Sequence, residues 1–175
     1  MTGNNEHTGH DAKAPYDSRP DTLLHSRRVG ALMVDMLQEG MRRAVEHDLS
    51  KTAPPEVDLF DRMTPRLKEA PYGSPAYTEA LTDLKPALDH HYAVSRHHPQ
   101  HFPDGVNGMT LVDLLELVAD WKASGERPGG TGSLERSVRL NQQRFDITDQ
   151  LAQILINTGR HFGWTDTKET NDESR

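Results

Sequence analysis

Among the apolar side chains of this chain only helical spacing stands out, and the alternation typical of a strand is absent. Over residues 21–44 the helical pattern is carried by Leu24, Val29, Leu32, Met33, Met36 and Leu37. Further helices are predicted across 55–69, 75–98, 111–121, 133–144 and 148–162, with turns rich in Pro and Gly between them. The predicted fold class is therefore all-α, a single-domain helical bundle.

The polar ends of the chain limit its folded part. Residues 1–20 contain almost no large apolar side chain and residues 165–175 contain none, so both are predicted to be disordered tails. The stretch between them, 21–164, is long enough to bury a core and predicts one domain. No segment approaches the ~20 apolar residues of a membrane span, and the N-terminus has no apolar signal region.

Composition narrows the chemistry that this chain can perform. It has no cysteine, so a metal would have to be held by His, Asp and Glu, and a cytoplasmic location is expected. The formal net charge of −7 disfavours a non-specific nucleic-acid binder, which needs a basic surface. A nucleotide substrate stays compatible with that charge, because a bound metal supplies positive charge locally.

Histidine is the residue type whose placement is most informative. The segment 90–101 contains His90, His91, His97, His98 and His101. His91 and His98 are seven residues apart and would share one face of a continuous helix, as would His90 and His97. Two of these histidines are expected to be metal ligands, with His91 and His98 favoured. The others would hold a ligand, contact a substrate or face solvent.

The adjacent His47 and Asp48 are the centre of the predicted site. A metal ion needs neutral imidazole and ionised carboxylate, and this pair supplies one of each. Both side chains can reach one ion if the backbone turns there, as it does at the end of a helix. Lys51 extends the pair to an HDxxK pattern. By itself the pair would also fit a surface turn.

His25 and an acidic face of a later helix could also belong to the metal site, but each has a second interpretation. His25 shares a helical stripe with apolar residues and is expected to face the core, where a lone histidine is commonly a packed core residue. Asp113, Glu116 and Asp120 share one face of a predicted helix. Such a face is either solvated or lines a wet cleft, and residue spacing leaves the two interpretations even.

The order H…HDxxK…HH…HH…VAD resembles the HD superfamily of metal-dependent phosphohydrolases. The chain is similar in particular to an uncharacterised branch found in bacteria and phages. The motifs of that branch are HDxSK, Pro-Glu, HHxxxxxHH and ExxxDW, and they stand here at residues 47–51, 55–56, 90–98 and 116–121. The resemblance implies a helical bundle of the HD-domain type across 21–164.

The resemblance also implies roles for individual residues. The metal ligands would be His25, His47, Asp48, His91, His98 and Asp120, around one or two divalent ions. The catalytic residues would be Asp48, which holds the attacking water, and Lys51, which lies near the phosphate. Supporting or substrate-contacting roles are expected for His90, His97, His101, Glu116 and Arg96. Ligation by imidazole and carboxylate favours Mn, Fe, Co, Ni or Zn over calcium.

The expected reaction is hydrolysis of a phosphate ester or anhydride, with a nucleotide or another small phosphorylated molecule as substrate. Two alternatives stay open at this point. Some HD-type proteins hold two irons and act as oxygenases, and a non-catalytic helical protein could hold a structural metal or none. Neither a membrane partner nor strong nucleic-acid binding is expected, and a homo-oligomer stays open.

Overall fold

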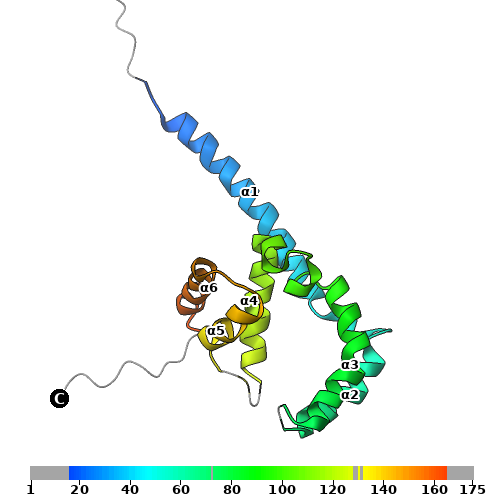
Figure 1. Ribbon diagram of the computed structural model, residues 1–175. Coiled ribbons are helices and arrows are strands. Elements are labelled where there is room, and N and C mark those ends of the chain that lie inside the picture. Colours follow the sequence, from blue (N-terminus) through cyan, green and yellow to red (C-terminus); the bar gives the residue numbers. More distant parts are fainter. Residues whose placement is uncertain (1–15, 72, 128–129, 131, 165–175) are drawn as a thin grey trace, which may run out of the picture. The chain divides into compact units, whose positions relative to one another are not determined.

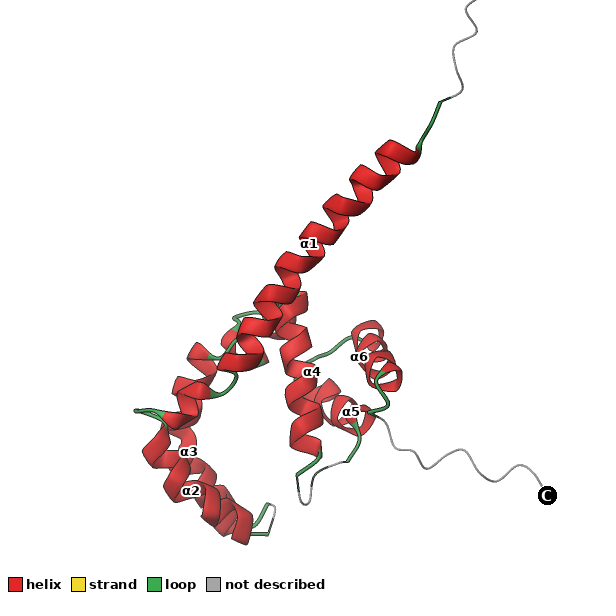
Figure 2. Cartoon of the chain, turned by 180° about the vertical axis from the view of Figure 1, so that it is seen from behind, coloured by secondary structure: helices red, strands yellow, loops and turns green. Residues whose placement is uncertain are grey.

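The computed structural model describes residues 16–71, 73–127, 130 and 132–164, and within them helices are the only regular structure (Figures 1 and 2). The α-helices are α1 (Arg19–Glu46), α2 (Val57–Glu69), α3 (Pro75–Val94), α4 (Leu111–Gly125), α5 (Leu134–Arg144) and α6 (Asp149–His161). Short 3-10 helices, η1 (Leu49–Thr52), η2 (Pro99–His101) and η3 (Gly105–Gly108), lie in the connections. No strand occurs in this part of the chain, so the all-α prediction is confirmed. None of the described helices is long and apolar enough to cross a bilayer.

The chain divides into two compact units within α1, between Leu37 and Gln38. The described part of the first unit is the N-terminal portion of α1, and its apolar stripe is exposed. His25 lies there and is also exposed, so the expectation that it faces a core is wrong. The physical reason is that a single helix offers its apolar face nothing to pack against within its own unit. The predicted tails fall mostly outside the described residues, although α1 already begins at Arg19.

The second unit contains two clusters of buried apolar side chains. The larger cluster joins α4, α5 and α6 through residues such as Val118, Leu134 and Ile156. The smaller one lies between α2 and α3, which run side by side, and includes Met63 and Leu84. Together the two clusters fix α3, which carries His90 and His91, and α4, which carries Glu116 and Asp120.

Capping fixes the N-terminal ends of two helices. The Thr110 hydroxyl accepts a hydrogen bond from the backbone N–H of Asp113, and the Asp113 carboxylate accepts one from the backbone N–H of Thr110. The Thr148 hydroxyl accepts from the backbone N–H of Leu151 at the start of α6. α4 therefore begins at a defined residue, which sets the register of its acidic face.

The end of α3 differs from the prediction. The helix passes through Pro86 and ends at Val94, although the sequence predicted helix as far as residue 98. Pro99 disfavours helical backbone at the residue before it, and His98 is accordingly extended, with φ −98° and ψ 129°. His97 and His98 thus lie in the turn between α3 and η2, where helical spacing no longer determines which way they point.

Candidate metal centre

His47 and Asp48 lie at the turn that follows α1. Glu46 is the last residue of the helix, and Asp48 adopts the left-handed conformation, with φ 58° and ψ 10°. Aspartate is one of the few residues other than glycine that adopt this conformation at modest cost. The turn brings the two side chains together, with His47 Nε2 3.6 Å from Asp48 Oδ2. The prediction that the pair sits at a helix end is confirmed.

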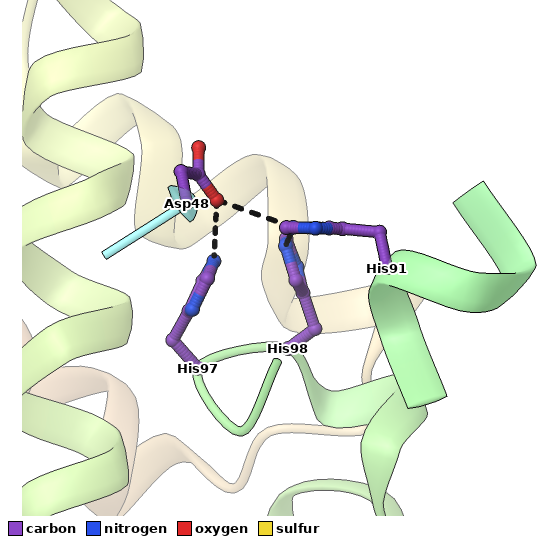
Figure 3. Close-up of side chains that lie close together, drawn as sticks. All are labelled: Asp48, His91, His97 and His98. Atoms are coloured by element: carbon purple, nitrogen blue, oxygen red, sulfur yellow. Dashed lines mark hydrogen bonds and ion pairs between the residues drawn. The ribbon is translucent and has the colours of Figure 1, made fainter. Parts of the chain in front are cut away.

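Three histidines approach Asp48 from α3 and the turn after it (Figure 3). Asp48 Oδ1 lies 3.2 Å from His91 Nε2 and 3.5 Å from His97 Nε2. His98 Nε2 lies 3.0 Å from His91 Nε2. The candidate ligand atoms of these four residues all lie within 4.8 Å of one another. His97, for which the sequence predicted only a supporting role, therefore belongs to the same group as His91 and His98.

The other oxygen of Asp48 faces His47, which in turn lies close to Asp120. His47 Nε2 lies 3.7 Å from Asp120 Oδ1, and the Asp120 side chain is only 17% exposed. The acidic face of α4 thus lines the site, which is the second of the two interpretations that the sequence left open. Five of the six predicted ligands, Asp48 among them, thus lie in one group of neighbouring side chains, and the role of His25, in the first unit, stays a prediction.

The distances between these atoms suit a shared cation. Two donors at ~2.1 Å from one ion, with an angle of about 90° to 110° between them, lie about 3.0 to 3.4 Å apart. Asp48 Oδ1 and His97 Nε2 are buried and have no hydrogen-bond partner among the described residues. Each such atom costs about 1–3 kcal/mol when left unsatisfied, and one cation would satisfy both. The residues therefore fit a divalent metal bound by imidazole and carboxylate.

In three of the histidines, the ring nitrogen that points away from the centre, Nδ1, is hydrogen-bonded to a carboxylate. Glu116 Oε1 lies 2.9 Å from His47 Nδ1 and 3.0 Å from His97 Nδ1. Glu56 Oε2 lies 3.1 Å from His91 Nδ1. Since an ionised carboxylate only accepts hydrogen bonds, each Nδ1–H donates, and each Nε2 keeps its lone pair for the centre. Metal-binding histidines are held in this way in most known sites.

Glu116, His47 and His97 could also be considered a second group of metal donors, because their atoms lie equally close together. Their separations of 2.9 and 3.0 Å are those of ordinary hydrogen bonds between Nδ1 and the carboxylate. We therefore assign Glu116 to holding the two rings. The sequence predicted either a supporting role or a solvated face for this residue.

Glu56 belongs to the candidate site, although the sequence did not predict a role for it. It is fully buried and accepts hydrogen bonds from His90 Nδ1 at 2.7 Å and from the Ser50 hydroxyl at 3.1 Å, in addition to the His91 contact. A buried carboxylate needs such partners. The Pro-Glu motif marked the position, but burial depends on tertiary packing and is not visible in the sequence. His90 consequently supports Glu56, and its ring is turned toward that carboxylate.

Lys51 is close to the centre as predicted. Its ammonium group lies 2.6 Å from Asp48 Oδ2 and 5.5 Å from the centroid of the Phe60 ring. The side chain is 31% exposed, so it is accessible from solvent. Lys51 thus places a positive charge beside the central carboxylate.

Two other predicted substrate contacts have partners within the protein. Arg96 binds Asp113 through two hydrogen bonds of 3.0 Å, and its guanidinium lies over the ring of Phe102. His101 Nδ1 donates to the backbone carbonyl of Tyr92 at 3.1 Å. Arg96 is still half exposed, whereas His101 has a structural contact that explains its position without a substrate.

The electrostatics of the site favour a cation. Burial and the neighbouring His97 and His91 lower the pKa of His98 to about 3, so its ring is neutral and able to bind metal. Burial alone would raise the pKa of Asp48, but its contacts with His91 and Lys51 hold it below the usual range.

The carboxylates on the acidic face of α4 also favour a cation at the site. Burial would raise the pKa of Glu116 and of Asp120, but their contacts with His47 keep both pKa values low. The carboxylates of Asp120 and Glu116 in turn raise the pKa of His47 to about 10. This cluster of negative charge thus favours positive charge at its centre, either a proton on His47 or a metal ion.

The buried Arg43 fixes the position of Glu116. Its Nε donates to Glu116 at 2.8 Å, and its Nη1 donates to Asp113 at 2.6 Å. Asp113 in turn caps the start of α4 and binds Arg96. This network connects the end of α1 to α4 and orients the carboxylate that holds His47 and His97.

Replacing Glu56 with glutamine should weaken metal binding by about 10- to 100-fold, because the amide cannot accept hydrogen bonds from both His90 and His91 as the carboxylate does. Competition titration with Co²⁺ or Zn²⁺ and a chromophoric chelator measures the change. Glu69→Gln, at the exposed end of α2, is the matched control and should bind as the unmodified protein does. Equal affinities for the two variants would contradict the role of Glu56.

Replacing Asp113 with asparagine should lower the free energy of unfolding by about 2 kcal/mol at pH 7. Burial would raise the pKa of Asp113, but Arg96, Thr110 and Arg43 lower it to about 2 from the ordinary 3.8. A depressed folded-state pKa contributes stability above the unfolded-state pKa, and this contribution is lost as pH falls through about 2. The difference in free energy of unfolding between the variant and the unmodified protein should therefore be about half as large at pH 3 as at pH 7.

Urea denaturation at pH 7 and pH 3 checks this pH dependence. Asp61→Asn, at an exposed position of α2, is the control, and its free energy of unfolding should differ little from that of the unmodified protein at both pH values. A loss for Asp113→Asn that is the same at both pH values would show that its ionisation does not stabilise the fold.

The fold and the site together define an all-helical protein with a candidate metal centre of imidazole and carboxylate donors. Residues 15–161 match a family of unknown function, DUF5662, and the chain belongs to this family. No curated protein and no solved structure matches the chain.

Proposed function

We propose that this protein is a metal-dependent phosphohydrolase of the HD-domain type, which cleaves a small phosphate ester or anhydride with an activated water. The observation that carries the proposal is the convergence of histidine Nε2 atoms on Asp48, with carboxylates holding Nδ1 on three of the rings. One or two divalent ions would be held by His47, Asp48, His91, His97, His98 and Asp120. When bound, such an ion lowers the pKa of a coordinated water and polarises a phosphoryl oxygen.

The residues around the centre support an anionic substrate. A cavity of about 220 Å³ reaches Asp48 and His97, and its wall includes three arginines, Arg42, Arg43 and Arg96, beside Glu46 and Glu116. These arginines are paired with carboxylates of the protein, and the partly exposed Lys51 adds a fourth cationic side chain beside Asp48. Fixed positive charges of this kind stabilise the charge that develops on a phosphoryl group during transfer. Asp48, with its pKa held low, stays ionised and able to orient the attacking water.

The test is to measure metal content and turnover on the same preparation. The protein would be loaded with Mn²⁺ or Co²⁺ and assayed for phosphate release from p-nitrophenyl phosphate and nucleoside phosphates, and for conversion of cyclic dinucleotides to linear products by chromatography. We expect stoichiometric metal and turnover of at least one class of ester. Stoichiometric metal without turnover of any of them would contradict the hydrolase.

One observation also favours a second function, a di-iron oxygenase. The two oxygens of Asp48 face different sets of rings, His47 on one side and His91 with His97 on the other, so these residues would offer donors for two ions. Iron loading without oxygen, followed by measurement of oxygen consumption with candidate organic substrates, tests this function. Oxygen uptake that depends on iron and substrate would favour it over hydrolysis.

A further inference from the structure

An apolar groove opens beside the candidate metal centre. It has a volume of about 290 Å³ and lies between the end of α1 and one face of α4, within the second unit. His47 and Asp120 form part of its lining. The groove is therefore continuous with the residues proposed to bind metal, and a molecule bound there would reach them.

The chemistry of the lining limits what the groove can recognise. Apart from the charged and imidazole groups at the centre, its lining is aliphatic: Gly40, Ala44, Val112, Leu115, Ala119 and Ala123. None of these described residues offers an aromatic ring for stacking or a side-chain hydrogen-bond group. The two other polar residues of the lining, Arg43 and Glu116, are already paired with each other. A nucleobase would find neither stacking nor hydrogen bonds here, whereas an alkyl group would be buried favourably.

Small side chains keep the groove open. A Cβ atom at Gly40 would lie 3.3 Å from Leu115 Cδ2, so a larger residue at position 40 would crowd the facing wall. Ala44 and Ala119 are exposed to the groove next to the donors, Ala44 three residues before His47 and Ala119 directly before Asp120. Space for an apolar group is therefore available close to the proposed reaction centre.

We infer that the groove binds the aliphatic part of the substrate, and that the substrate is a phosphate ester of an apolar alcohol. This inference rests on the proposed function, because the phosphate has to face the metal centre. In the reaction the oxygen of water forms a new bond to phosphorus, and the bond from phosphorus to the alkyl oxygen breaks. The alkoxide leaves with a proton from the water, and the products are the alcohol and inorganic phosphate.

The experiment measures binding and turnover across a series of chain lengths. Binding of methyl- to octylphosphonate and of adenosine monophosphate to the Mn²⁺-loaded protein is followed by calorimetry, and hydrolysis of the corresponding alkyl phosphates is assayed in parallel. Affinity and kcat/KM should rise by up to about fourfold per added methylene until the groove is filled, the factor that ~0.8 kcal/mol per buried CH₂ corresponds to. Adenosine monophosphate should bind no better than methylphosphonate.

Variants with larger side chains in the groove test where the alkyl chain binds. Ala119→Leu and Ala123→Leu should each reduce the ratio of octyl- to methylphosphonate affinity by at least about tenfold, since both fill space that the alkyl chain would occupy. Ala76→Leu adds the same side chain at an exposed position of α3 outside the groove, and should keep the full dependence on chain length.

The outcomes separate this inference from the proposed function. Hydrolysis with no dependence on chain length, or with a preference for the nucleotide, would overturn the inference and leave the hydrolase standing. Phosphonate binding that strengthens with chain length, without turnover of any ester, would support the groove and contradict the hydrolase. A dimer in solution that Ala119→Leu dissociates would show that a second copy of the chain occupies the groove, and would also overturn the inference.

Discussion

Replacing Asp48 with asparagine should abolish stoichiometric metal binding and lower turnover by more than about a hundredfold. Mutating a residue that only hydrogen-bonds to a metal ligand already lowers metal affinity or activity by about 10–100-fold. The reason is the central position of this carboxylate. One of its oxygens faces His91 and His97, and the other faces His47 and Lys51. The substitution removes the negative charge that both sets of contacts share.

Metal analysis after dialysis and competition titration measure this loss. Asparagine tolerates the left-handed backbone of position 48, so the variant should keep its fold and its circular dichroism spectrum. Asp104→Asn, at an exposed position before η3, is the matched control and should retain metal. An Asp48→Asn protein that is folded and still binds one equivalent of metal tightly would remove the basis of the proposed centre.

Replacing Arg43 with methionine should reduce the free energy of unfolding by about 3–5 kcal/mol, the usual cost of removing one partner of a buried ion pair. The substitution keeps most of the apolar length of the side chain but leaves Glu116 and Asp113 without their shared cation. Urea denaturation at neutral pH measures the change.

The neighbouring arginine supplies the control for this prediction. Arg42 is exposed and pairs with Glu39 and Glu46 on the surface of α1, so Arg42→Met should cost less than about 1 kcal/mol. Arg43→Lys should give an intermediate loss, because it retains the charge but not the planar fork that contacts two carboxylates. Similar losses for Arg42→Met and Arg43→Met would contradict the importance of the buried network.

The fold class and the centre of the site could be predicted because both depend on local features of the chain. Helical periodicity predicted helices in the regions where α1 to α6 lie. The adjacent His47 and Asp48 were expected at a helix end, and they lie there. Propensity and spacing within one segment are enough for predictions of this kind.

The remaining features depend on tertiary structure or on where a helix ends. Choosing His98 and not His97 assumed a helix through residue 98, but α3 ends at Val94, and both rings reach the same centre. Glu56 and Glu116 hold the rings only because they are buried against them. Sequence periodicity shows neither where a helix will stop near a proline nor which carboxylates will lose contact with water.

Glu116 holds a ring from the end of α1 and another from the loop after α3, and it lies on the helix that also packs against α5 and α6. A small rotation of α4 would therefore shift two donor nitrogens at once and in a correlated way. In the proposed centre the coordination geometry would consequently depend on the packing of Val118, Leu134 and Ile156 in the core. Core substitutions there should then change which divalent ion the proposed centre prefers, and selectivity for the metal would be in part a property of the hydrophobic interior.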